Sequence, residues 1–285
     1  MADDFKRVIS KMDDKSSGDG PKGIPYFLKR NLVQKSFGQE KYTFTETTDR
    51  ILESNCYHME DVTCNLCLYN EQLNIPHLPE IVFPNNSFKI GCDDGTVINF
   101  VTLDALKEID VTKWPEFKVG SSEEWLHTRE EYKNITPSGK PFDWSYTSFY
   151  KGTLGEKVAV ETTDEKIDYE KLKRRDPITN YGNFTLYEDE LHDNGLARME
   201  IKYRSMAERV FVLQRFFLRI DNVMVRIVDT RLYHENESGY WLREWSLREQ
   251  KVADMDEELK TNLKDVDYLA ANLPLQDVQM EKLIF

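Results

Sequence analysis

The chain has 285 residues, of which 40% are hydrophobic and 12% are aromatic, and its formal net charge at pH 7 is −13. This apolar content is enough for a sizeable core and excludes a largely disordered chain. The acidic charge and the lack of a long apolar run lead us to expect no nucleic-acid partner, no membrane association and no secretory signal.

Residues 1–40 are predicted to form a flexible N-terminal arm that precedes a single domain, residues 41–285. In the arm, the segment FKRVISKM places four apolar residues at helical spacing: Phe5, Val8, Ile9 and Met12. This spacing fits either a short partner-docking helix or a transient helix in a disordered arm. The following DDKSSGDGPKG is typical of a flexible linker.

From Lys41 onward, short helices and strands are predicted. KYTFTET favours a strand, DVTCNLCLYNEQL has the length of a helix, and SFKIGCDDGTVINFV predicts a hairpin around Asp94-Gly95. TLDALKEI predicts a helix with Thr102 as its cap, and SSEEWLHTREEY follows the capping-box pattern. DYEKLKRR predicts another short helix before Pro177.

The clearest strand pair lies late in the chain. RVFVLQRFFLRI and VMVRIVDTRLY are joined by Asp221-Asn222, two residues that tolerate positive φ. The first strand of this pair, residues 209–220, is apolar on both alternating faces, which is typical of a central, covered strand. With YWLREWSL as a further strand, the pattern predicts an α+β fold with a mainly antiparallel sheet flanked by short helices.

The first candidate for site chemistry is the Cys-x-x-Cys pair in CNLC, Cys64 and Cys67. A structural zinc ion needs two more ligands. Cys56 and Cys92 are available, but the sequence contains no second close pair. We therefore interpret these cysteines as core thiols and expect no metal and no cofactor.

The second candidate is the acidic segment YEDELHDNG, residues 187–195. A metal-dependent hydrolase is the alternative function that it suggests, with four possible ligands: Glu188, Glu190, His192 and His234. However, the chain has no HExxH, nucleophile-elbow or phosphate-loop motif. HDNG also contains three turn-forming residues in a row, which favours a hydrated acidic turn between two strands.

The third candidate is the strand segment in VDTRLYHE. Ile227, Asp229 and Arg231 alternate onto one face of a strand that begins apolar. Two interpretations stay open: Asp229 and Arg231 make directed hydrogen bonds to another chain, or they pair internally with Arg243 or Glu244 on the next strand.

Four longer motifs then carry a resemblance: PFDWSYTSFYKGTL, YEDELHDNG, RFFLRIDNVMVRIVDTRLYHE and WLREWSLRE, with the ending MEKLIF. Together they resemble the TIPRL family, the TOR signalling pathway regulator-like proteins, from about Lys41 to Phe285. The resemblance implies a non-enzymatic protein that binds catalytic subunits of type 2A, type 4 and type 6 protein phosphatases and inhibits or shelters them. It also implies TOR signalling, through a phosphatase-binding regulator, and a cytoplasmic location that extends to the nucleus.

The resemblance also implies partner-binding residues. Four positions match family contacts: Asp104 in TLDAL, Ile167 in KIDYEKL, and Ile227 and Asp229 in RIVDTR. We add Arg231, which shares the face of Asp229. These five residues are expected to form one patch on a monomer, with no catalytic residue and no metal ligand among them. Whether the acidic turn touches the partner stays open.

Overall fold

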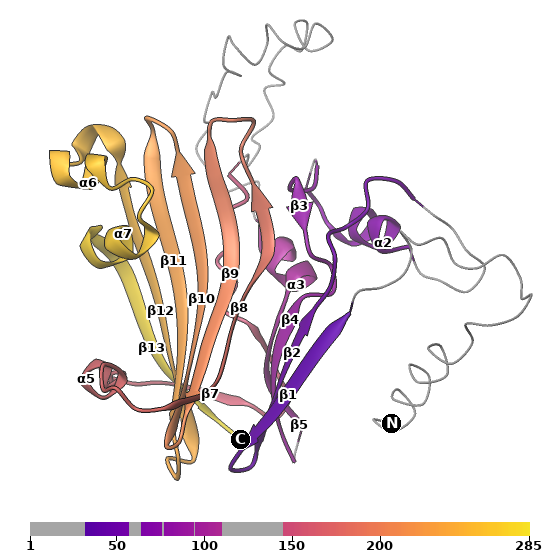
Figure 1. The fold of residues 1–285 in the computed structure, drawn as a ribbon, viewed down its shortest axis with the longest axis vertical. Helices are drawn as coiled ribbons and strands as arrows, with labels where there is room; N and C mark the ends of the chain where they lie inside the picture. Colours follow the sequence, from indigo (N-terminus) through magenta and orange to yellow (C-terminus); the bar gives the residue numbers. More distant parts are fainter. Residues whose placement is uncertain (1–31, 57–63, 76, 94, 110–144) are drawn as a thin grey trace, which may run out of the picture. The chain divides into compact units, whose positions relative to one another are not determined.

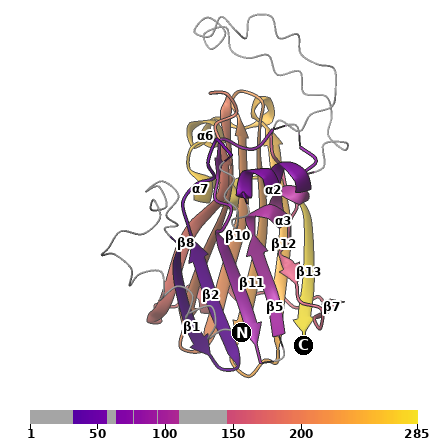
Figure 2. The same cartoon turned by 90° about the vertical axis from the view of Figure 1, so that its right-hand side faces the viewer.

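The computed structural model describes residues 32–56, 64–75, 77–93, 95–109 and 145–285, and these form two antiparallel β-sheets that pack face to face (Figure 1 and Figure 2). The expected α+β class, with mainly antiparallel sheet and short helices, is confirmed. In these ranges, no helix is long and apolar enough to cross a membrane.

The small sheet has the strand order β1-β2-β4-β5-β6. Its strands are β1 (Val33–Gln39), β2 (Tyr42–Thr48), β4 (Ser87–Cys92), β5 (Gly95–Val101) and β6 (Thr153–Leu154). The first of these corrects the predicted boundary at residue 40, because residues 33–39 pair with β2 along their whole length. Residues 1–31, with the apolar spacing noted above, lie outside the described residues.

Two local features explain why β1 belongs to the body. Glu40 adopts φ 52°, which allows a tight turn between Gln39 and Tyr42. Phe37 stacks on Phe44 with the ring centroids 4.7 Å apart. A chain that began at Lys41 would therefore lose the edge strand and uncover an aromatic ring.

The large sheet has eight strands in the order β3-β8-β9-β10-β11-β12-β13-β7. They are β3 (Ile81–Val82), β7 (Ala159–Thr162), β8 (Ile178–Asp189), β9 (Gly195–Met206), β10 (Arg209–Ile220), β11 (Met224–Glu235), β12 (Tyr240–Lys251) and β13 (Leu275–Ile284). The hairpin predicted around Asp221-Asn222 is present, with a three-residue loop, and β10 lies at the centre of the sheet and is buried along most of its length. Both predictions from the strand pattern are confirmed.

The main core lies between the two sheets. Phe88 of β4 stacks on Tyr203 of β9 with ring centroids 4.4 Å apart, and Phe44 of β2 lies 6.0 Å from Trp241 of β12. We call the side of the large sheet that makes these contacts its inner face. Since side chains alternate along a strand, the neighbouring residues point to the opposite side, the outer face.

The outer face is covered at two places by short helices (Figure 1). The α6–α7 cluster joins η3 (Val252–Asp254), α6 (Glu257–Thr261) and α7 (Val266–Asn272) to the sheet through buried Phe217, Val225, Ile227, Met255, Leu259, Leu269 and Leu273. The α5 cluster joins α5 (Tyr169–Leu172) to the sheet through Ile167, Leu172, Met206, Tyr233 and Leu242. The outer face therefore has two separate apolar centres.

Within the described ranges, two further helices, α2 (Asn65–Gln72) and α3 (Thr102–Lys107), pack against the main core. The prediction of Thr102 as a helix cap is wrong: it is the first helical residue, and its hydroxyl donates to the carbonyl of Phe83 at 2.7 Å. In the predicted hairpin, Cys92 pairs with Gly95, and residue 94 lies outside the described residues. The helix predicted at 121–132 also lies outside them.

Candidate partner-binding surface

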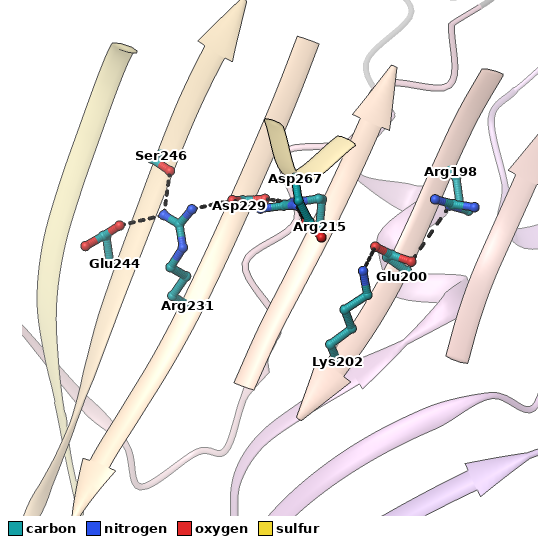
Figure 3. A network of polar contacts seen from close by, with 9 residues as sticks. All are labelled: Arg198, Glu200, Lys202, Arg215, Asp229, Arg231, Glu244, Ser246 and Asp267. Atoms are coloured by element: carbon teal, nitrogen blue, oxygen red, sulfur yellow. Dashed lines mark hydrogen bonds and ion pairs between the residues drawn. The ribbon is translucent and has the colours of Figure 1, made fainter. Parts of the chain in front are cut away.

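A line of polar side chains crosses the outer face between the two helix-covered clusters (Figure 3). The sheet register explains the line: Glu200 of β9 pairs with Arg215 of β10, which pairs with Asp229 of β11, which pairs with Ser246 of β12. Directly opposite residues in an antiparallel sheet share a face. We call this row and its flanking residues the polar belt: Arg198, Glu200, Lys202, Arg215, Asp229, Arg231, Glu244, Ser246 and Asp267.

Asp229 is the centre of the belt. Arg215 donates to it in a bidentate manner, from Nε to Oδ1 at 2.8 Å and from Nη2 to Oδ2 at 2.9 Å. Arg231 donates from Nη2 to the same Oδ2 at 2.5 Å. With its side chain only 1% exposed, Asp229 is a buried carboxylate held between two guanidinium groups.

The two arginines extend the belt in opposite directions. Arg215 reaches Asp267 of α7 at 2.9 Å, and Arg231 reaches Glu244 at 2.6 Å and Ser246 at 3.2 Å. Burial on its own lowers the pKa of Arg215, but the hydrogen bonds and charges of Asp229 and Asp267 outweigh it and raise the pKa. Both guanidinium groups are therefore fixed as cations by the acidic residues around them.

This geometry decides between the two interpretations of the strand segment. Ile227, Asp229 and Arg231 do share one face, and Asp229 does pair internally. Its partners are Arg215 and Arg231, however, and not Arg243, which donates to Glu281 at 2.8 Å. The carboxylate is enclosed, so the interpretation in which Asp229 points directly at another chain is wrong.

The expected apolar contacts are also enclosed. Ile227 is 1% exposed inside the α6–α7 cluster, and Ile167 is 4% exposed inside the α5 cluster. Each therefore positions the helices that border the belt.

Asp104 occupies a different part of the fold. It lies on α3, whose residues Ala105 and Leu106 pack in the main core, and it accepts a hydrogen bond from Thr153 of β6 at 2.5 Å. The structure thus brings four of the five expected residues to the outer face and leaves Asp104 on a helix at the small sheet.

The four side chains of the hydrolase alternative are not assembled. Glu188 lies beside Arg198 on the outer face. These two belong to a row of paired residues that continues across the sheet to Phe217 and Ile227. His234 lies seven residues further along β11, which at about 3.3 Å per residue separates the groups by roughly 20 Å. His234 is also committed elsewhere: its ring stacks on Trp241 at 4.9 Å, on the inner face.

The acidic segment is a structured turn, as HDNG predicts. Leu191, His192 and Asp193 all have φ between 54° and 63°, and a Cβ on Gly195 would lie 1.9 Å from the carbonyl oxygen of Arg219. It is less hydrated than expected, because Leu191 is fully buried. Burial raises the pKa of Asp189, although the backbone N–H groups of Glu80 and Leu191 donate to its carboxylate and oppose this shift.

A third arrangement was missed by the sequence analysis. Cys56 joins the CNLC pair: its Sγ lies 3.2 Å from that of Cys67, and the three Sγ atoms of Cys56, Cys64 and Cys67 lie within 4.8 Å of one another. Counting close pairs along the chain could not reveal this, since Cys56 precedes Cys64 by eight positions. Cys92 lies apart, on β4.

Comparison with known proteins identifies the family. The sequence profile of the TIP41-like family matches residues 81–256. The chain is similar to a TIP41-like protein of Caenorhabditis elegans, 38% identical over 87% of this chain and 90% of the relative. It is also similar to the human TIP41-like protein, 40% identical over 75% and 80% of the two chains.

The chain belongs to the TIP41-like family. A further relative, from Saccharomyces cerevisiae, carries the name "Type 2A phosphatase activator TIP41" and is 34% identical over 76% of this chain and 67% of its own. The resemblance seen in the sequence motifs is thereby confirmed. All residues of the polar belt except Asp267 lie in the segment that matches the TIP41-like profile, whereas the three clustered cysteines precede it.

Proposed function

We propose that this chain is a non-enzymatic regulator that binds the catalytic subunits of type 2A protein phosphatases, and their type 4 and type 6 relatives, in TOR signalling. The observation that carries the proposal is membership of the TIP41-like family, in which relatives from two yeasts are named type 2A phosphatase activators. Those names favour activation, whereas the sequence resemblance led us to expect inhibition or shelter. The sign of the effect is therefore an outcome to measure.

The arrangement of polar groups supports binding over catalysis. Across the described ranges, the only cluster of three or more potential metal ligands consists of cysteines, and Glu188 and His234, proposed for hydrolysis, lie on different faces of the large sheet. The polar belt is instead saturated with internal ion pairs. Such a network holds side chains in fixed positions, which suits recognition of another surface.

We place the contact on the outer face, beside the polar belt. A shallow hollow there is lined by residues of β9 and of the α6–α7 connection, including Arg198, Lys202 and Lys264. Its acidic members are engaged, since Asp267 binds Arg215 and Asp265 caps α7. Two of its cations are engaged as well, since Lys202 and Arg198 both pair with Glu200, at 2.7 and 3.8 Å. In a chain with a net charge of −13, the lining of this hollow still carries three cations against two acidic residues, which favours an acidic segment of a partner.

The test measures binding of the full chain to a purified type 2A catalytic subunit by calorimetry, and phosphatase activity in the same samples. We expect a one-to-one complex that weakens at least about tenfold, about 1.4 kcal/mol, in the double variant Lys202→Glu, Lys264→Glu. Lys89→Glu is the control, since Lys89 is an exposed cation of the small sheet. Absence of binding by the unmodified chain would refute the proposed function. An equal loss of affinity in the double variant and in Lys89→Glu would show that the contact does not lie at this hollow.

A further inference from the structure

The three clustered thiols form a possible ligand set outside the partner-binding surface. Cys64 is the N-cap of α2, and Cys67 lies in its first turn. Cys56 comes from the segment before the helix and is exposed, whereas the other two are half-buried. All four cysteines of the chain are thiols in the structure, and no disulfide joins any of them.

The spacing of the sulfur atoms fits one tetrahedral cation. With Zn–S bonds of about 2.3 Å, tetrahedral geometry separates the sulfurs by roughly 3.8 Å. The observed Cys56–Cys67 separation of 3.2 Å and the upper limit of 4.8 Å bracket this value. Because Cys56 is exposed, small changes in its side chain are enough to bring the three sulfurs to the distances that zinc requires.

We propose that Cys56, Cys64 and Cys67 bind one Zn²⁺ ion as three of its four ligands, with water at the solvent side. Soft thiolates select zinc over hard cations, and Zn²⁺ imposes no geometry beyond the tetrahedral arrangement. Binding replaces the three thiol protons with one dication, so three protons are released when the thiols start protonated. We thus depart from the sequence-based expectation of core thiols without metal.

A zinc ion suits the three sulfurs better than a disulfide does. A disulfide uses only two sulfurs, at about 2.05 Å, and leaves the third beside them without a role. It also needs an oxidant, which the structure does not supply. A cation uses all three sulfurs.

We assign the ion a structural role, although a water as fourth ligand leaves one coordination position open to solvent. Within the described residues, the cluster contains no carboxylate or imidazole that could transfer a proton. The ion would tie the first turn of α2 to the preceding segment, while the rest of α2 is held by Tyr69, whose hydroxyl donates to Pro84 at 3.1 Å. Gln72 of α2 accepts from Lys107 of α3 at 2.8 Å, so the same ion would steady the helix that carries Asp104.

The experiment uses the full chain, purified without chelator or metal-affinity resin and analysed by plasma mass spectrometry. We expect about one zinc per chain, retained through dialysis. Cys56→Ser and Cys64→Ser should each lose most of the zinc. Cys92→Ser is the matched control and should keep it, because Cys92 lies on β4, apart from the cluster.

A second measurement needs no variant and therefore does not depend on whether a variant folds. In the unmodified chain, three of the four thiols should react slowly with a thiol reagent until a zinc chelator is added. Cobalt added to the metal-free chain should give visible bands of a tetrahedral thiolate site. A chain that takes up neither metal, or a Cys56–Cys67 disulfide in the freshly purified protein, would overturn the proposal.

Discussion

The two faces of the large sheet are built in opposite ways. The inner face is covered by the small sheet and is mostly apolar and aromatic, with Trp241 and Phe216 fully buried against it. The outer face has two small apolar clusters with a charged belt between them. Dispersion and apolar burial stabilise the inner side, whereas charge pairing on the outer side fixes positions and adds little net stability. The inner side therefore carries most of the stability, and the proposed recognition uses the opposite side of the same strands.

The largest effect is expected on the inner face. Phe88 is fully buried and stacked on Tyr203, so Phe88→Ala removes an aromatic ring from the interface between the sheets. We expect a loss of about 3–5 kcal/mol in the free energy of unfolding, measured by chemical denaturation. Phe88→Leu retains much of the volume and should cost clearly less. Equal losses in both variants would show that the interface does not depend on ring packing.

The next effect lies at the centre of the polar belt. Asp229→Asn leaves the buried guanidinium of Arg215 with only one carboxylate partner, Asp267. We expect the free energy of unfolding, measured by chemical denaturation, to fall by about 3 kcal/mol. This is the lower end of the range for breaking a buried ion pair, because Asp267 remains.

Asp267→Asn is the matched control, because it removes a bond to the same arginine from a side chain that is 85% exposed. An exposed pair contributes at most about 1 kcal/mol, so this variant should remain near the unmodified chain. If the two variants lost the same stability, burial would not be what distinguishes the two sides of Arg215.

The register of one hairpin shows what the sequence could and could not predict. The strands, the turn residues and the shared face of Ile227 and Asp229 follow from the alternating pattern. A two-residue loop at Asp221-Asn222 would place Gln214 opposite Asp229. The actual loop includes Val223, and the one-residue shift places Arg215 there instead. A shift of one residue exchanges the two faces of a strand, so the partner of Asp229 could not be read from the sequence.

The cysteine cluster and the helix caps show the same limit of prediction from sequence, for residues that lie closer together in the chain. The cap of α5 by Asp168 involves residues three apart and is local. The approach of Cys56 to Cys67 depends on the path of the chain between them, and the hydroxyl of Thr102 donates instead to the carbonyl of Phe83, just after β3. Hydrogen bonds between residues close in the sequence can be predicted from their spacing. Contacts that depend on the tertiary fold cannot.

A smaller effect is expected where a helix covers the outer face. Leu259 of α6 is buried in the α6–α7 cluster. Leu259→Ala should lower the free energy of unfolding by about 2 kcal/mol. This is the lower end for buried Leu→Ala changes, because a small cluster under short helices can collapse around the cavity. Hydrogen exchange should increase in α6 and α7 and remain slow in β10 and β11. Uniformly faster exchange would mean that the two faces unfold as one unit.

The smallest effect concerns the cap that places Asp267 over Arg215. Asp265 accepts a hydrogen bond from the backbone N–H of Tyr268 at 2.9 Å and so begins α7. Asp265→Ala should cost about 1 kcal/mol, whereas Asp265→Ser keeps a capping oxygen and should recover most of that loss. Both variants remove the charge, so their difference isolates the hydrogen bond.

Because α7 carries Asp267, frayed helix ends should also reduce the contribution of the Arg215–Asp267 pair to stability. A double-mutant cycle between Asp265→Ala and Asp267→Asn measures this coupling. Strictly additive losses would show that the outer cluster holds α7 in place without its cap.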